Sequence, residues 1–184
     1  MTTPGSKVSS GSDSGALAAV IALGLGGVLA LAYALWAFTA RRGIFADFAD
    51  GNPVSTDDAK SSDTMDTIFL LVAGLVALVA LGLWIARFVG RKSKGDGIDL
   101  AGMAVAGIGV LVVLVGLFLA SGIADADGQS AQGDKGVTAT MITGGGFLLL
   151  AVGLLMGLLK VRGPRKDTAS SPAGGYPQQG YGNW

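Results

Sequence analysis

The residue types that carry most enzyme and metal chemistry are absent from this chain, and its carboxylates belong to a single residue type. The 184 residues include no Cys and no His, and all 13 acidic residues are Asp. A chain without Cys and His lacks the thiolate nucleophile, the common proton shuttle and the commonest zinc and haem ligands. Catalysis would have to rest on Asp, Ser, Tyr or Lys. We therefore expect a protein that is not an enzyme and binds no cofactor.

Two short motifs resemble ligand-binding loops, and each departs from its pattern at a required position. Asp125–Gly128 begins like a calcium loop, but Gln129 and Ser130 stand where the third ligand and the Gly are needed. Gly90–Gly95 has the first two glycines of a phosphate-binding loop, but Asp96 follows where Lys is required. We expect solvated acidic and basic surface at these places, and no metal or nucleotide site.

Polar side chains within the apolar parts of the chain are a further set of candidates for chemistry. An ionisable residue inside a membrane span is the usual mark of an ion or proton pathway. The four long apolar runs contain none, and their notable polar residues are Ser121, Thr138, Thr140 and Thr143. Hydroxyl groups of this kind commonly bond to the backbone of their own helix. The sequence therefore argues against a coupled transporter.

The elements that must position these residues are four long apolar runs. They cover residues 16–40, 67–86, 100–123 and 137–159. A helix rises about 1.5 Å per residue, and the hydrocarbon core of a bilayer is about 30 Å thick, so each run can cross a membrane. The sequence predicts an all-α membrane fold, with four transmembrane helices in an antiparallel up-down bundle over residues 16–162. The formal net charge of +0 gives no field that would attract nucleic acid.

Short polar segments join and flank the spans. The predicted outer loops are residues 41–66 and 124–136, the inner loop is 87–99, and segments 1–15 and 163–184 are expected to be disordered. In the first outer loop, Phe45 and Phe48 lie at helical spacing and are candidates for contact with a partner. Ser55 can cap a helix with acidic residues in its first turn, so we expect a helix from there into the second span.

The distribution of Lys and Arg predicts which side each loop faces. Nine of the 13 basic residues lie in the N-terminal segment, in the loop 87–99 and from Lys160 onward, and the other four are Arg41, Arg42, Lys60 and Lys135. Because basic residues concentrate on the cytoplasmic side of the inner membrane, we expect both termini in the cytoplasm. Arg41 and Arg42, just past the first span, are the residues that oppose this orientation.

Small residues recur at positions that would bring helices close together. In the first span they form a ridge with a spacing of four residues: Ala18, Ala22, Gly26, Ala30 and Ala34. In the third span, spacings of four and three alternate along a mostly small-residue seam suited to left-handed packing: Gly102, Ala106, Gly109, Val113, Gly116 and Ala120. The fourth span repeats this pattern with Gly146, Gly153 and Gly157. The spacing leaves open whether these faces meet within the chain or meet another subunit.

Three segments carry a resemblance to a known group of proteins. They are the exit from the first span through Arg41 and Arg42, the segment Gly51–Asp58, and the ending Leu83–Arg87 of the second span. Together they resemble small uncharacterised multi-span membrane proteins of actinobacteria, and the Gly175–Tyr181 part of the tail is similar to tails of that phylum. The resemblance implies no functional residue. Similar small proteins occur as accessory subunits of larger membrane complexes, including respiratory assemblies.

From the sequence we expect an accessory, scaffold or assembly subunit of a larger membrane complex. Its partners would be the lipid bilayer and other membrane protein subunits, met through the helix faces and the first outer loop. Three alternatives remain open at this point. A homo-oligomeric channel needs a polar stripe along one span, and a lipid-handling protein needs a large apolar cavity. An enzyme needs Asp, Ser or Tyr side chains clustered at one level of the membrane.

Overall fold

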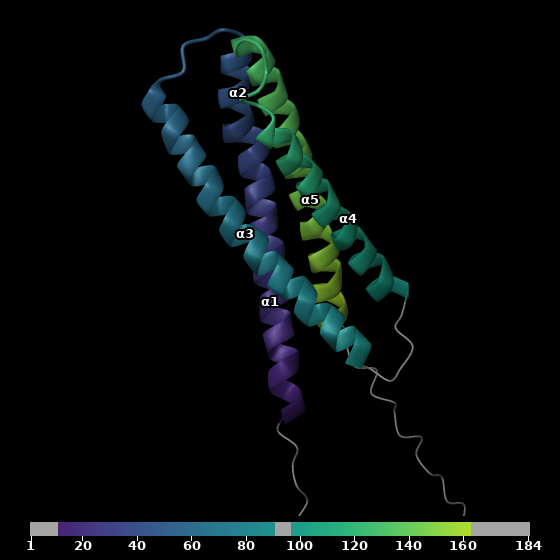
Figure 1. The fold of residues 1–184 in the computed structure, drawn as a ribbon. Coiled ribbons are helices and arrows are strands. Elements are labelled where there is room, and N and C mark those ends of the chain that lie inside the picture. The colour runs from purple at the N-terminus through teal and green to yellow at the C-terminus, as the bar shows by residue number, and fades with distance from the viewer. Residues whose placement is uncertain (1–10, 91–96, 163–184) are drawn as a thin grey trace, which may run out of the picture.

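The computed structural model describes residues 11–90 and 97–162, and Figure 1 shows their arrangement. The helices are α1 (Gly11–Trp36), the π-helical turn η1 (Ala37–Arg41), α2 (Arg42–Ala49), α3 (Thr56–Gly90), α4 (Gly97–Ser121) and α5 (Gln129–Arg162). Within the described residues, four helical stretches are long and apolar enough to cross a membrane: Leu17–Ala49, Thr56–Gly90, Asp99–Ser121 and Gln129–Lys160. The predicted fold class, an all-α membrane bundle of four spans, is confirmed.

The helices extend further than the apolar runs predict. Helix α1 begins at Gly11, inside the segment 1–15 that we expected to be disordered, since lengthening a helix is far easier than starting one. Much of the expected outer loop 41–66 is helical, and only residues 50–55 connect α2 to α3 there. Helix α5 likewise begins inside the expected loop 124–136. Residues 1–10, the basic segment 91–96 and the tail 163–184 lie outside the described residues.

Local sequence signals explain the turn between α2 and α3. Gly51 has a positive φ of 75°, and the backbone N–H of Asn52 donates to the carbonyl of Asp47 at 2.9 Å, which closes the end of α2. The Ser55 hydroxyl then accepts the N–H of Asp58 at 3.0 Å and donates to its carboxylate at 2.6 Å. The expected helix start near Ser55 is confirmed, and α3 continues unbroken to Gly90.

The four spanning helices form an open row and not a closed square. Helix α5 packs along α4 on one side and along α1 on the other, and α3 packs chiefly on α1 (Figure 1). In an up-down bundle the short loop between the second and third spans would make them neighbours, but α3 and α4 make little contact. Complementary small residues decide the pairing, since each helix packs where its neighbour allows the closest backbone approach.

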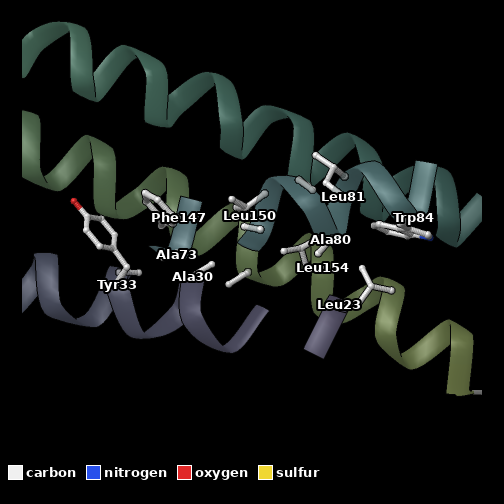
Figure 2. Packing of buried hydrophobic residues seen from close by; sticks show 14 of the residues in the cluster. Leu23, Ala30, Tyr33, Ala73, Ala80, Leu81, Trp84, Phe147, Leu150 and Leu154 are labelled. Atoms are coloured by element: carbon white, nitrogen blue, oxygen red, sulfur yellow. The ribbon is translucent and has the colours of Figure 1, made fainter. Parts of the chain in front are cut away.

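The core between these helices is narrow and rich in alanine. Figure 2 shows it extending from Tyr33 at one end to Trp84 at the other, and its largest fully buried side chains are Phe147, Leu23 and Leu154. The outer surface is apolar as well, with Leu111 63% exposed and Phe118 77% exposed. In water such a surface would drive aggregation, whereas lipid chains cover it at no cost.

Candidate functional site at the polar end of the bundle

Arg41 is the centre of a polar cluster that joins the end of the first helix to α3. Its guanidinium group contacts the Asp63 carboxylate at 2.6 Å and the Asp66 carboxylate at 3.8 Å, and it donates a hydrogen bond to the Ser62 hydroxyl at 2.9 Å. The same group lies 4.6 Å from the centre of the Phe45 ring, over its face. The Arg41 side chain is 12% exposed, so these contacts replace most of its water.

Tyr33 connects this cluster to the apolar core. The residue is 2% exposed, and its hydroxyl group donates a hydrogen bond to Asp66 at 3.1 Å. Its ring meets Phe69 edge-on, with ring centres 5.9 Å apart, and lies against the tilted ring of Phe147 at 4.3 Å. A buried Tyr needs a partner for its hydroxyl group, and Asp66 supplies one at the boundary of the core.

The π-helical turn η1 helps to place Arg41. The backbone N–H of Arg42 donates to the carbonyl of Ala37, five residues earlier, in place of the usual four. The wider turn changes the direction in which later side chains leave the helix, and Arg41 ends this turn on the side of α3. On α3, Asp63 and Asp66 are three residues apart and therefore share one helix face. Turns of this kind occur often at functional sites.

A small cavity of about 50 Å³ lies beside the cluster, where all the spanning helices converge. Its polar lining comes from Tyr33, Arg41, Asp66, Thr140 and Thr143. The Thr143 hydroxyl donates to the carbonyl of Ala139 at 2.8 Å, as expected for a hydroxyl that bonds to its own helix. The volume suits one or two water molecules and no larger ligand.

The chemistry available to this cluster is limited by its composition. One guanidinium group faces two carboxylates, so the cluster carries a net negative charge and has hydrogen-bond donors in Tyr33 and Ser62. Among the described residues, no group of three or more acidic side chains is arranged to hold a metal ion. The arrangement can fasten α1 to α3 at the membrane boundary. We therefore interpret the cluster as a structural contact that holds α1 against α3 and leaves the Asp63 carboxylate exposed.

The small-residue seam of the third span faces the fourth span of the same chain. The buried residues Gly102, Ala106, Gly109 and Gly116 of α4 lie toward α5. A Cβ atom at Gly109 would stand 2.6 Å from the Leu150 nitrogen and 2.8 Å from the Gly146 carbonyl oxygen. A Cβ at Gly153 would stand 2.6 Å from the Ala106 nitrogen. The two backbones are therefore almost in contact, which requires glycine on both sides.

The remaining predicted packing residues divide into buried and exposed groups. Gly26, Ala30 and Ala34 are buried, and a Cβ at Gly26 would lie 3.0 Å from that of Ala80 on α3. At the start of the same ridge Ala22 is half-buried and Ala18 is exposed. The ridge therefore serves α1–α3 packing over its second half and leaves its first half on the outer surface.

Two further helix contacts involve residues that the sequence patterns did not predict to be packing residues. On α3, Ala73, Ala77 and Ala80 are fully buried and form the counterpart of the α1 ridge. At the other end of the core, the Trp84 ring fills the space above two glycines, so that a Cβ at Gly102 would lie 2.7 Å from the ring and one at Gly157 2.8 Å from it. Trp84 thus joins α3 to both α4 and α5.

Phe45 and Phe48, the residues expected to contact a partner, differ in their surroundings. The Phe45 ring lies directly on Gly136 of α5, where a Cβ atom would overlap it, and under the Arg41 guanidinium group. Ala49 makes a similar close approach to Gly133. Phe45 therefore holds α2 against α5 within the chain. Phe48 is half-buried, and its role toward a partner stays a prediction.

Sequence reasoning missed Tyr33, Asp63 and Asp66 as members of a site and treated Arg41 only as a residue that opposes the predicted orientation. Two signals could have identified them. A Tyr within an otherwise apolar run needs a polar partner, and Arg41 follows it by two helical turns. Carboxylates three residues apart, one turn before the second span, were available on the neighbouring helix.

Comparisons with models of known protein families, with curated proteins and with solved structures give no match for this chain. Function is therefore inferred from the geometry of the helices and of the polar cluster.

Proposed function

We propose that this protein is an accessory or scaffold subunit that assembles with other proteins in the cytoplasmic (inner) membrane, with both termini in the cytoplasm. The observation that carries the proposal is the open row of helices. Helices α3 and α4 stand at its two edges, and large apolar side chains cover their outer faces. Edge helices that pack mainly along one neighbour retain wide faces on which the spans of a partner can pack.

The interior of the bundle supports the same proposal. Its core is filled by alanine, leucine and a few aromatic side chains, and the cavity among the four helices is about 50 Å³. The Arg41 cluster and the α4–α5 seam fix the relative positions of the helices. A rigid core with apolar edges suits a protein that acts through its surface. The resemblance to small actinobacterial membrane proteins suggests a respiratory assembly as the larger complex.

Site-specific photo-crosslinking tests the proposal. A crosslinking amino acid is placed on the outer edge of α3 at Leu75, which is 62% exposed, and on that of α4 at Leu111, which is 63% exposed. Ala106, which is fully buried in the seam, is the matched control. We expect one or both edge positions to capture a defined membrane protein in intact cells, and the control to capture none.

The other outcomes of this experiment are also informative. Capture of a second copy of the chain from both edges would favour a homo-oligomeric channel over a scaffold. Crosslinks to lipid alone from both edges, together with no copurifying protein after gentle extraction, would contradict the proposal.

A further inference from the structure

The small cavity beside Arg41 is lined by a buried threonine that makes no hydrogen bond with its side chain. Thr140 of α5 is 8% exposed and lines this cavity of about 50 Å³. Five other helical threonines donate their hydroxyl to the carbonyl four residues earlier: Thr39, Thr64, Thr67, Thr138 and Thr143. The Thr140 hydroxyl makes neither this bond nor another one among the described residues. Because a buried hydroxyl without a partner is costly, Thr140 needs a partner on the cavity side.

A carboxylate oxygen of the same cavity also lacks a close partner. Asp66 of α3 lines the cavity, and its Oδ1 atom accepts the Tyr33 hydroxyl at 3.1 Å. Its Oδ2 atom lies 3.8 Å from the Arg41 Nε atom, which is too long for a direct hydrogen bond. Within the described residues, no other hydrogen bond reaches this oxygen. Polar groups separated by such a distance can be joined by a water molecule between them.

The lining of the cavity determines which ligand fits. The Arg41 guanidinium group disfavours a cation, and the Asp66 carboxylate disfavours an anion, so a neutral ligand is favoured. That ligand must donate a hydrogen bond to the carboxylate and accept one from a hydroxyl or a guanidinium group. The volume of about 50 Å³ excludes molecules much larger than water. The Asp66 side chain is 22% exposed, so water from the polar end of the bundle can reach it.

We propose that the cavity binds an ordered water molecule that joins α5 to the Arg41 cluster. The water donates a hydrogen bond to Oδ2 of Asp66 and accepts hydrogen bonds from the Thr140 hydroxyl and the Arg41 Nε–H. Three partners are the usual number for a buried water. The direct ion pairs and hydrogen bonds of the cluster connect the first helix to α3, and the water extends this network to α5. This proposal is independent of the scaffold function, because it concerns the interior of a single chain.

Thr140→Val tests the water through the sign of its effect on stability. Valine has nearly the shape of threonine but removes the hydroxyl group from the bridge. We expect the unfolding midpoint of the purified full chain in detergent to fall by about 2–4 °C, the shift that follows the loss of one hydrogen bond in a chain of this size. Without a bound water the hydroxyl would be unpaired, and its removal would leave the midpoint unchanged or raise it. Either of those results would overturn the proposal.

Asp66→Asn separates the water bridge from a hydrogen bond within α5. A neutral amide binds water more weakly than a carboxylate does, so Thr140→Val should lower the midpoint clearly less when Asp66→Asn is also present. Thr138→Val is the matched control, because it makes the same change at an exposed threonine that donates to its own helix. Its effect should be the same with and without Asp66→Asn. An equal loss from Thr140→Val in both backgrounds would mean that this hydroxyl also bonds to its own helix, and the proposal would fail.

The salt in the buffer separates a bound water from a bound cation. The midpoints of the wild type and of Thr140→Val are measured in sodium chloride, potassium chloride and choline chloride at equal ionic strength. We expect the difference between the two proteins to be the same in all three salts, because the ligand is neutral. A difference that grows with sodium concentration and disappears in choline would assign the cavity to a sodium ion and overturn the proposal. This comparison does not use Asp66→Asn, so it remains decisive even if that variant fails to fold.

Discussion

Arg41 lies where the apolar part of the first helix ends, and its neighbours determine what its charge does there. Asp66 is partly buried and has two partners, the guanidinium group of Arg41 and the hydroxyl of Tyr33. Asp63 is 67% exposed, so its pairing with Arg41 is weakened by water although the distance is short. The interaction that matters for stability is therefore the one that compensates Asp66. Removing a partner from a partly buried carboxylate costs more than the pair itself contributes.

Arg41→Gln should lower the free energy of unfolding by about 1–3 kcal/mol, because Asp66 then keeps a charge with one partner fewer. Arg42→Gln, at the exposed neighbouring position, should change it by less than about 0.5 kcal/mol. Thermal unfolding in detergent micelles measures both variants. Adding Asp66→Asn to Arg41→Gln should recover part of the loss. Equal effects of Arg41→Gln and Arg42→Gln would show that the cluster adds nothing to stability.

Phe45→Ala should lower the free energy of unfolding by about 1–2 kcal/mol, because the ring packs on Gly136 and under the Arg41 guanidinium group. The measurement is the same unfolding curve of the isolated protein. Phe48→Ala is the cleaner probe for a partner. If Phe48 contacts a partner, that variant reduces recovery of the copurified protein and leaves the unfolding midpoint in place. No change for Phe45→Ala would mean that the contact with α5 is not stabilising.

At the scale of the helices, the apolar runs predict the number and order of the spans, because crossing a membrane imposes a minimum length. The small-residue spacing in residues 100–123 predicts a packing face, and the structure places that face against α5. The pattern could not identify the partner helix, since any surface with glycine at matching heights would fit. Composition alone also could not predict where the helices end. In the sequence, Arg41 marks the end of the first apolar run. In the structure it pairs with α3, and the helix continues to Ala49.

Gly109→Ala tests the α4–α5 seam against a glycine on the same helix. At Gly109 the new methyl group would stand 2.6 Å from the Leu150 nitrogen, whereas at Gly107 nothing lies within 4 Å. We expect Gly109→Ala to cost about 1–3 kcal/mol because both backbones must separate. Gly107→Ala should be neutral or stabilise the helix by up to about 1 kcal/mol. Unfolding midpoints of the two variants decide the matter, and equal midpoints would rule out a close seam.

At the scale of the whole molecule, both charged connections described at one end of the bundle carry more acidic than basic residues. This distribution, with nine basic residues in the other segments, favours cytoplasmic termini. Arg41, one of the opposing residues, is ion-paired with Asp63 and Asp66 and is therefore largely neutralised. The polar cluster then lies at the outer leaflet.

Cysteine labelling tests this orientation, because the chain has no Cys of its own. Asn52→Cys, in the exposed turn after α2, should react with an impermeant maleimide on intact cells. Ser93→Cys, in the basic segment outside the described residues, should react only after lysis. Ser62 is a poor reporter for this purpose, because it is 4% exposed and bonded to Arg41. The reverse labelling pattern would contradict this orientation and place the polar cluster at the inner leaflet.

The distance between the polar groups of the bundle predicts that the isolated protein does not conduct ions. Arg41, Tyr33 and Asp66 lie at the end of the bundle where α4 finishes, since Leu117 and Ala120 line the same cavity. Asp99, which is 3% exposed, lies at the opposite end, where α4 begins. About 30 Å of helix separates the two ends, and Phe147, Leu150 and Leu154 fill the described core between them. A proton or sodium ion crossing there would have to lose its hydration without replacement.

Liposomes that contain the purified protein should therefore hold a proton or sodium gradient as long as empty liposomes do, with an added ionophore as the positive control. Faster decay that scales with the square or a higher power of protein content would mean that several copies assemble a pore, and the channel interpretation would then replace the scaffold.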